Sequence, residues 1–393
     1  MLSVEPVIPG ISAIASEFID VRRRIHAHPE LAYEETQTSE LVAGLLAQWG
    51  YEVHRGLGKT GVVGVLTQGE GGKRIGLRAD MDALPIEEAT GLPYTSKHAR
   101  TMHACGHDGH TAMLLCAARY LAESQQFSGT LIVIFQPAEE GEAGARAMIE
   151  DGLFEKFPCD AVFGLHNMPG LPAGDMYFTP GPGMASSDRV NITVRGVGGH
   201  GAMPHVARDP MPAVASIMLG LNSIVAREVD AQKSAVITVG SVQAGEACNV
   251  IPETALLKLS VRALDADVRT QLQERITALA KATAQAYGCT AEIDYELGYP
   301  VLVNHAEPTA FATDVAVKML GAQRIDPAAK PLMGSEDFAF MLEACPGTYA
   351  WIGNGVGSKG GCMVHNPGYD FNDDILAIGA SYWVRLAEAW LAD

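Results

Sequence analysis

The 393-residue sequence predicts an α/β fold built on a mostly parallel sheet, with a second, smaller unit in the middle of the chain. In the first third, apolar strands alternate with helical patterns, as is typical of parallel sheets covered on both faces. Residues 188–295 then follow the order βαββαβ, which is the ferredoxin-like plan. After this unit the alternation of helices and strands resumes, so one chain combines two fold types.

Two amphipathic helices open the chain and short apolar strands follow them. Periodic apolar residues predict helices at 11–28 and 34–49, and Gly50 ends the second one. Strands are expected at 61–67, 74–79, 130–135 and 160–165, and a further helix at about 110–123. Because these strands are apolar almost throughout rather than at alternate positions, we expect both faces of the sheet to be buried.

The later segments complete the expected order. The middle unit comprises strands at 188–195, 234–242, 255–262 and 289–295, and helices at 210–226 and 265–287. Beyond it we expect a helix at 308–320, a helix beginning near 334–337, a strand near 348–352 and a final helix at 373–391. Segments at 179–184 and 298–304 bound the middle unit, the first of them rich in Pro and Gly.

Acidic residues outnumber basic ones, with 46 Asp and Glu against 28 Lys and Arg, and the formal net charge is −18. Binding to nucleic acid or to an anionic membrane surface depends on Lys and Arg, so the charge argues against both kinds of partner. The one basic run, at residues 22–24, is expected to form the solvated face of a helix.

The N-terminal segment is a poor signal peptide, because it lacks a basic start and Pro6 and Pro9 interrupt its apolar character. The longest uncharged apolar stretch, at 210–226, contains proline, glycine and asparagine and is typical of a buried helix. The seven cysteines are odd in number and widely scattered, which argues against a disulfide framework. We therefore expect a protein of the reduced cytoplasm.

The densest group of chemically active residues is MHACGHDGH, at 102–110. Cys105 and His107 are two positions apart, so a turn at the intervening glycine can direct both side chains inward. Thiolate and imidazole together favour a transition metal such as Zn, Mn, Co or Ni over Mg or Ca. The start of a helix explains Asp108 and His110, but it does not explain Cys105 and His107, which we predict to be metal ligands.

Carboxylates follow two of the predicted strands. Glu139 and Glu140 lie beyond an apolar strand, at the edge where open α/β sheets place their sites. Neighbouring residues point in different directions, so one glutamate can bind a metal while the other accepts a proton. Asp80 and Asp82 lie at the end of another strand, where they can act as ligands or as groups that orient imidazoles.

Two further histidines extend the predicted metal site. His166 follows an apolar strand, and His365 lies near the C-terminus. Together with Cys105, His107 and Glu140 they make five candidate ligands, which are enough for two metal ions that share a bridging water.

A site that includes His365 has a consequence for the domain organisation. This histidine lies beyond the βαββαβ unit, so the site can form only if that unit is an insertion. We therefore predict that residues 1–184 and 298–393 are two parts of one catalytic domain. Residues 185–297 are predicted to form the inserted domain.

An ordered set of motifs resembles the aminoacylase/carboxypeptidase family of metallopeptidases. The motifs are RADMDALP (78–85), HACGHDGHTA (103–112), FQPAEEGEAGARAMIEDGLFE (135–155), GLHNMP (164–169), GHGAMPH (199–205), NVIP (249–252), GSEDFAFM (334–341) and HNPGYDFND (365–373). The resemblance covers nearly the whole chain. It is closest to the amidohydrolase branch, which contains hippurate hydrolases, N-acyl-amino-acid deacylases and plant auxin-conjugate hydrolases.

The resemblance implies a metallopeptidase catalytic domain interrupted by a lid and dimerisation domain. It implies that the five candidates bind two divalent ions, with Mn, Zn, Co and Ni all open, and that Glu139 is the general base. Asp82 matches an aspartate that supports a metal-binding histidine two residues earlier. Here that earlier position is Asp80, and whether it binds metal directly stays open. Glu142 and Ala143 interrupt a glycine run found in many relatives.

Residues near the substrate are also implied by the resemblance. His200 matches a lid histidine that reaches the active site of the partner subunit, where it would stabilise the oxyanion. Asn249 and Arg262 match lid residues near the substrate, and Gly334 matches a backbone contact to it. Alternatively, Arg262 pairs with a local aspartate such as Asp265. The implied assembly is a homodimer, or a dimer of dimers, formed through the lid domain.

The implied reaction is hydrolysis of the amide bond of an N-acyl amino acid, such as hippurate or an N-acetyl amino acid, to a carboxylate and an amino acid. One alternative is a dipeptidase or carboxypeptidase of the same family. A second is a thiol hydrolase in which Cys105 is the nucleophile and His107 or His166 the base. The third is a metal-dependent binding protein without catalysis. Five ligands are superfluous to a thiol nucleophile and a binding protein needs no general base, so the amidohydrolase is favoured.

Overall fold

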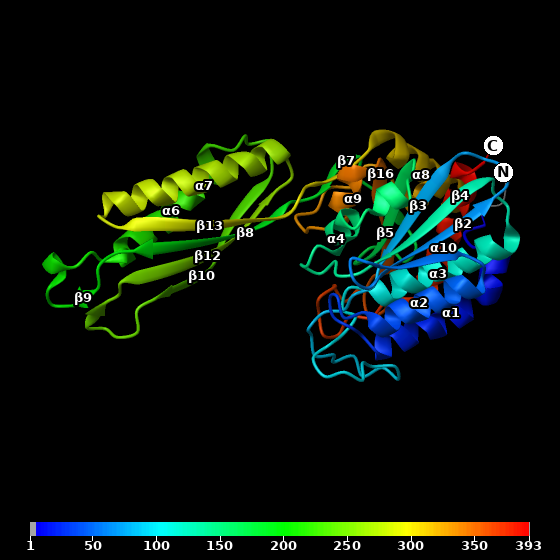
Figure 1. Cartoon of the computed structure of the whole chain (residues 1–393), viewed down its shortest axis with the longest axis horizontal. Coiled ribbons are helices and arrows are strands. Elements are labelled where there is room, and N and C mark those ends of the chain that lie inside the picture. Colours follow the sequence, from blue (N-terminus) through cyan, green and yellow to red (C-terminus); the bar gives the residue numbers. More distant parts are fainter. Residues whose placement is uncertain (1–4, 393) are drawn as a thin grey trace. The chain divides into compact units, whose positions relative to one another are not determined.

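The computed structural model describes residues 5–392 of the chain, which divide into two compact units (Figure 1). Unit 1 comprises the described residues up to Gly181, then Val303–Lys330 and the described residues from Asp337 onwards. Unit 2 comprises Pro182–Leu302 and Pro331–Glu336. The chain therefore leaves unit 1 after Gly181 and returns to it at Val303.

An eight-stranded sheet in the order β1-β2-β4-β3-β5-β16-β6-β15 forms the centre of unit 1. Its strands are β1 (Glu52–Leu57), β2 (Gly61–Gln68), β3 (Arg74–Asp80), β4 (Gly129–Gln136), β5 (Ala161–Pro169), β6 (Met176–Phe178), β15 (Ile325–Asp326) and β16 (Gly347–Gly355). The four central strands β4, β3, β5 and β16 are parallel to one another, whereas β1, β2 and β6 join antiparallel neighbours. The predicted α/β class with a mainly parallel central sheet is confirmed.

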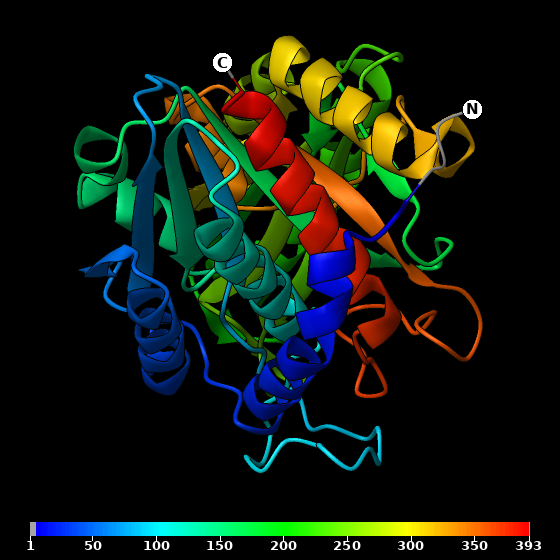
Figure 2. The ribbon, with the colours of Figure 1, turned by 90° about the vertical axis from the view of Figure 1, so that its right-hand side faces the viewer.

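Helices cover this sheet. They are α1 (Pro9–Ala27), α2 (Thr36–Gln48), α3 (His107–Ser124), α4 (Gly144–Glu150), α5 (Leu153–Lys156), α8 (Ala306–Leu320), α9 (Phe338–Ala344) and α10 (Leu376–Trp390), with 3₁₀ helices η2 (Ala322–Arg324) and η3 (Asp373–Ile375). Figure 2 shows α1, α3, α8 and α10 together on one face of the sheet. Most side chains of α3 are buried, because this helix packs against the sheet on one side and against α1 and α10 on the other.

The register of the parallel strands sets where polar residues collect. Asp80 at the end of β3 is aligned with Gln136 at the end of β4, and Arg78 is aligned with Gly164 of β5. The carboxyl ends of β3, β4 and β5 therefore lie at one edge of the sheet. In open α/β sheets this edge is where ligands bind.

The basic run at residues 22–24 does not form the solvated helix face that was expected of it. The side chain of Arg22 is completely buried, so the prediction of a solvated basic face is wrong for this residue. Its guanidinium forms ion pairs with Asp108, Asp370 and Asp373. Only Arg24 is exposed as expected, because successive residues of a helix point about 100° apart.

Unit 2 contains a four-stranded antiparallel sheet in the order β10-β12-β8-β13. Its main elements follow the chain order β8 (Ser187–Arg195), α6 (Pro210–Arg227), β10 (Ala235–Ala244), β12 (Thr254–Ala263), α7 (Ala266–Ala286) and β13 (Thr290–Tyr299). The smaller elements of unit 2 are β9 (Gly199–His200), η1 (Pro204–Val206) and β11 (Val250–Ile251). Strands β7 (Gly181–Met184) and β14 (Leu302–Asn304) lie where the chain passes from one unit to the other. Buried and more exposed residues alternate along the strands, and the buried side chains pack against α6 and α7.

Both long helices of unit 2 begin at aspartates. The side chains of Asp209 and Asp265 accept hydrogen bonds from the N–H groups of Met211 and Val268, which lie in the first turns of α6 and α7. Such N-caps satisfy backbone donors that have no partner inside the helix. Among the described residues, no helix combines the length and the apolar character that crossing a membrane requires.

Candidate metal centre

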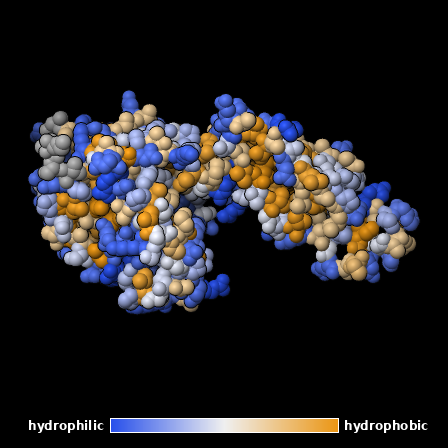
Figure 3. All heavy atoms as spheres, turned by 180° about the vertical axis from the view of Figure 1, so that it is seen from behind, coloured by the Kyte–Doolittle hydropathy of each residue, from blue (hydrophilic) through white to orange (hydrophobic). Residues whose placement is uncertain are grey.

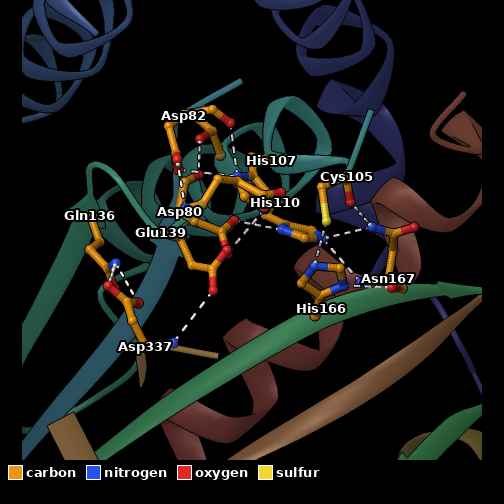
Figure 4. A network of polar contacts seen from close by, with 12 residues as sticks. Asp80, Asp82, Cys105, His107, His110, Gln136, Glu139, His166, Asn167 and Asp337 are labelled. Carbon is orange, nitrogen blue, oxygen red and sulfur yellow. Dashed lines mark hydrogen bonds and ion pairs between the residues drawn. The ribbon is translucent and has the colours of Figure 1, made fainter. Parts of the chain in front are cut away.

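Three of the predicted ligands meet at the carboxyl edge of the sheet in unit 1 (Figure 4). Cys105 lies in the turn before α3, His107 is the first residue of α3, and His166 lies on β5. One ligand atom of each lies within 4.8 Å of the others, and Cys105 Sγ is 3.4 Å from His166 Nε2. All three side chains are buried. They form a compact sulfur and nitrogen cluster.

The two remaining candidates adjoin this cluster. Glu140 and His365 form a second group with Cys105, again within 4.8 Å, and His365 Nε2 is 3.2 Å from Glu140 Oε1. A third group joins His107 to Glu139 and Glu140. Cys105 and Glu140 each belong to two such groups, and His107 belongs to three, one of them with Asp80 and His110, so the donors form one connected cluster.

The fold holds His365 in a specific backbone conformation. Its φ of 62° is in the left-handed region, which L-residues adopt rarely. Its N–H donates to the carbonyl oxygen of Ala104 at 2.7 Å, directly beside Cys105. A segment near the C-terminus is thereby fastened to the turn that carries the thiol.

The chemistry of the donor set fits divalent cations. The Nε2 atom of His107 is buried and has no hydrogen-bond partner among the described residues. Burial and the neighbouring Glu140 carboxylate raise the pKa of the Cys105 thiol well above its usual value, as expected where negative groups face one another without a cation. Burial also lowers the pKa of His166, which favours the neutral imidazole that binds metals.

Asp82 supports two of the candidate ligands. Its backbone carbonyl accepts a hydrogen bond from His107 Nδ1 at 2.9 Å, which leaves Nε2 of that ring for a metal. Its carboxylate Oδ2 accepts the N–H of Glu140, also at 2.9 Å. In this chain Asp82 therefore orients His107 and Glu140.

The contacts of Asp80 bear on whether it binds metal. Its Oδ1 is 2.6 Å from His110 Nδ1, and its Oδ2 accepts a 2.7 Å hydrogen bond from Arg78. Burial opposes the charged form, but His107 and Arg78 outweigh it and hold the pKa of Asp80 well below its usual range. Both carboxylate oxygens of Asp80 therefore have polar partners, and the same carboxylate forms a group with His107 and His110 whose ligand atoms lie within 4.8 Å of one another.

A buried network that the sequence did not predict lies beside Glu139. Gln136 accepts a hydrogen bond from Arg78 Nε at 2.8 Å and donates to both carboxylate oxygens of Asp337. The N–H of Asp337 is 3.4 Å from Glu139 Oε1 (Figure 4). Gln136 and Asp337 both belong to the motifs noted above, but nothing in the sequence indicates that they touch.

Asn167 is a second unpredicted residue. It donates to the carbonyl oxygen of Cys105 at 2.7 Å and accepts from the Tyr369 hydroxyl at 2.8 Å. Gly106, whose φ is 93°, lies against the same two side chains. A Cβ at this position would lie 2.3 Å from Asn167 Nδ2 and 2.4 Å from the Tyr369 hydroxyl oxygen. The turn between Cys105 and His107 therefore requires glycine.

Comparison with known proteins agrees with this site. The profile described as Peptidase family M20/M25/M40 matches residues 76–389, which is most of the chain. The chain belongs to this family. The predicted resemblance to its amidohydrolase branch is confirmed by the relatives described next.

Two curated relatives and one solved structure match nearly the whole chain. The chain is 49% identical over 385 residues to a hippurate hydrolase of Campylobacter jejuni subsp. jejuni, covering 98% of this chain and 99% of that one. It is 40% identical over 385 residues to the N-acetyl-L-cysteine deacetylase of Bacillus subtilis (strain 168), covering 98% and 90%. The crystal structure of the Bacillus subtilis YXEP protein, described as a dinuclear metal binding peptidase from the M20 family, superposes with a TM-score of 0.84 at 34% identity, covering 97% and 99%.

The four predicted residues near the substrate all lie in unit 2. His200 is exposed on β9, and its Nδ1 accepts a hydrogen bond from the N–H of Ala202. Asn249 is exposed beside β11. Arg262, on β12, donates to the carbonyl oxygen of Met333 at 3.1 Å, and the carbonyl oxygen of Gly334 accepts the N–H of Ala185.

The alternative partner suggested for Arg262 is engaged elsewhere. Asp265 forms an ion pair with Lys233 at 2.8 Å and caps helix α7. Among the described residues, Arg262 forms no ion pair with a carboxylate, and its guanidinium donates instead to the carbonyl oxygen of Met333. The guanidinium charge is therefore not neutralised within unit 2.

Proposed function

We propose that this protein is a metal-dependent amidohydrolase that cleaves N-acyl amino acids to a carboxylate and an amino acid. The observation that carries the proposal is the position of Glu139 beside the cluster of Cys105, His107 and Glu140. This arrangement supplies both a cation site and an adjacent proton acceptor. The near full-length similarity to relatives named hippurate hydrolase and N-acetyl-L-cysteine deacetylase supports the same conclusion.

The proposed cofactor is a pair of divalent ions from the group Mn, Zn, Co and Ni. The residues that would hold them are the five predicted ligands, Cys105, His107, Glu140, His166 and His365. Bound there, such cations would polarise the amide carbonyl and lower the pKa of a water molecule that they share.

Glu139 would move the proton. It is buried, and its carboxylate lies within 4.8 Å of ligand atoms of His107 and Glu140, so it would lie close to a water molecule bound there. We assign it the removal of a proton from that water and the delivery of the proton to the leaving amine nitrogen. A general base that later acts as the acid returns to its starting state in each cycle.

Unit 2 would supply groups that bind the substrate. We propose that His200 acts in the site of the partner subunit, where it donates a hydrogen bond to the developing oxyanion. Such a donor typically contributes about 3 kcal/mol to the transition state. We assign substrate binding to Asn249, Arg262 and Gly334, as the family resemblance implies. For Arg262 the structure adds support, because its guanidinium has no carboxylate partner within unit 2 and suits the α-carboxylate of an amino acid.

The partner would be a second copy of the chain, joined through unit 2. Strand β10 is an edge strand, and no strand within the described residues pairs with its outer side. Val236 and Val242 on this strand are exposed, as are Met211 and Leu219 on the adjacent helix α6. Apolar side chains gather on the face of unit 2 seen in Figure 3. An unpaired strand edge and exposed apolar side chains near it favour association with another chain, so we propose a homodimer.

The reduced cytoplasm is the proposed location, since none of the seven cysteines forms a disulfide.

The proposal is tested with the purified protein after reconstitution with Mn, Zn, Co or Ni. The substrates are N-benzoylglycine, N-acetyl amino acids, N-indoleacetyl amino acids and unblocked dipeptides. We expect metal-dependent release of amino acid from the N-acyl compounds and little from the dipeptides. Preferential cleavage of dipeptides would instead support a dipeptidase. Tight metal binding without turnover of any substrate would support a binding protein.

A further inference from the structure

The loop that carries Glu139 and Glu140 is held by carboxylates from three other parts of the chain. We call residues 137–145, which follow β4 and include the first two residues of α4, the glutamate loop. Three of its backbone N–H groups donate to buried carboxylates: Ala138 to Glu35 at 2.8 Å, Glu140 to Asp82 at 2.9 Å and Ala145 to Asp337 at 2.8 Å. Asp82 and Asp337 belong to the candidate site, but Glu35 has no role in the proposed mechanism.

Glu35 is an unusual buried residue. It immediately precedes α2, and none of its surface is exposed to solvent. Its Oε2 accepts a 2.6 Å hydrogen bond from Thr60, and its Oε1 accepts the N–H of Ala138. Among the described residues, no Lys, Arg or His forms an ion pair with it. Burying a carboxylate without a cation is costly, so its position calls for an explanation beyond packing.

The residue that Glu35 holds is itself strained. Ala138 is completely buried and has a φ of 54°, in the left-handed region. For an L-residue with a Cβ this conformation costs about 1–2 kcal/mol, and it persists only where the surroundings enforce it. The carbonyl oxygen of Ala138 accepts the N–H of Gly144, which closes the loop at 3.0 Å. The residue directly after Ala138 is the proposed general base, Glu139.

We propose that Glu35 is a positioning residue for Glu139. By accepting the N–H of Ala138, it fixes the direction in which the chain leaves β4 and therefore the place of the Glu139 carboxylate. The inference rests on the proposed role of Glu139 as the base. Because Asp82 holds Glu140 through a separate hydrogen bond, loss of Glu35 affects proton transfer more than metal binding.

The kinetic test compares Glu35→Ala, Glu35→Gln and the control Glu34→Ala, which alters the exposed neighbouring residue. For Glu35→Ala we expect kcat to fall by up to about 10²-fold, the typical effect of displacing a catalytic group by 1 Å. KM and the number of bound metal ions stay near the wild-type values. Glu35→Gln retains most of kcat, because its amide oxygen can accept from Ala138 while its NH₂ donates to Thr60. Glu34→Ala behaves as wild type.

Hydrogen–deuterium exchange of the metal-free protein gives a second readout that does not depend on activity. We expect the peptide spanning the glutamate loop to exchange faster in Glu35→Ala than in the wild type, in Glu35→Gln or in Glu34→Ala. If Glu35→Ala does not fold, Glu35→Asp replaces it, since the shorter side chain cannot reach both Thr60 and Ala138. The same results are expected of this variant.

Four results overturn the inference, and the first three concern kcat and the loop itself. They are wild-type kcat in the Ala or Asp variant, unchanged exchange of the glutamate loop, and a Gln variant as impaired as the Ala variant. Loss of bound metal in step with kcat also contradicts it, because Glu35 would then act on Glu140 rather than on Glu139. An inactive wild type counts against the proposed function alone, since the exchange experiment still tests whether Glu35 holds the loop.

Discussion

Arg22 Nε lies 2.8 Å from Asp108 Oδ2, and neither side chain is exposed to solvent. The same guanidinium also pairs with Asp370 and Asp373, which follow His365 in the chain. Asp108 directly follows His107. The buried guanidinium of Arg22 therefore links the start of α3, which carries His107, to the segment that carries His365.

Replacing Arg22 is expected to destabilise the protein strongly. Arg22→Met leaves buried carboxylates without their cation, and breaking a buried ion pair in this way typically costs about 3–5 kcal/mol. Urea unfolding followed by circular dichroism measures the loss. Arg24→Met, on the exposed side of the same helix, is the control and should leave the free energy of unfolding nearly unchanged. Equal stability of the two variants would contradict the structural role of the pair.

Glu139→Gln is expected to keep the metal ions and lose turnover. The amide has nearly the shape of the carboxylate but cannot take a proton, and loss of a general base typically costs about 10²–10⁴-fold in rate. Metal content by mass spectrometry and kcat on an N-acyl amino acid are the measurements. Glu142→Gln, at an exposed position of the same loop, serves as the control. Substantial residual activity in Glu139→Gln would remove the assignment.

Metal removal distinguishes the amidohydrolase from a thiol hydrolase. We expect chelation to abolish activity and readdition of Mn or Co to restore it, because the proposed cations would activate the attacking water. Cys105→Ser should weaken metal binding in calorimetry and abolish the thiolate-to-cobalt charge-transfer band of the cobalt-substituted protein. Activity that survives chelation but not thiol alkylation would instead identify Cys105 as a nucleophile.

A shared active site predicts complementation between two inactive variants. His200→Ala lacks the proposed oxyanion donor and Glu139→Gln lacks the base. A mixed dimer contains one site in which both groups are intact. After subunit exchange, verified by native mass spectrometry of differently tagged chains, the mixture should regain activity that neither variant has alone. Verified exchange without recovery would show that His200 does not act across the dimer.

The raised pKa of Glu35 should make the stability of the protein depend on pH. Burial raises its pKa from 4.5 to about 7, so the folded state keeps a proton that the unfolded state loses above pH 4.5. Stability from this group is full below about pH 4.5 and falls until about pH 7, by about 3 kcal/mol in total. Glu35→Gln should therefore become progressively more stable than the wild type across this interval. A constant difference in unfolding free energy between pH 4.5 and 7 would contradict the raised pKa.

Sequence patterns located the core of the fold because the parallel strands are apolar almost throughout. Strands β2 and β4 were expected within one or two residues of their observed ends. Strand β1 was not expected, since its sequence EVHRGL is mostly exposed and it pairs only with β2. Helix α3 begins three residues earlier than expected, because Gly106 adopts a left-handed conformation just before His107.

The sequence predicts those residues of the candidate site that lie close together in short motifs. Cys105 and His107 are recognisable because they are two residues apart, and Glu139 and Glu140 because they are adjacent. The contact between Gln136 and Asp337 spans 201 positions of the chain and follows from the fold alone. Burial of Arg22 could not be predicted either, since its partners are distant in sequence and two further arginines follow it directly.

The position of β16 in the sheet determines when unit 1 can be completed during synthesis. This strand lies between β5 and β6, which do not pair with each other, yet it is made after all of Pro182–Leu302. Until residues 347–355 have been synthesised, the chain lacks the strand that lies between β5 and β6 in the folded sheet. His365, the fifth candidate ligand, follows that strand and is therefore synthesised later still. A polypeptide that ends before β16 lacks a central strand of the sheet and one candidate ligand, His365. We therefore expect truncated translation products to have no hydrolytic activity.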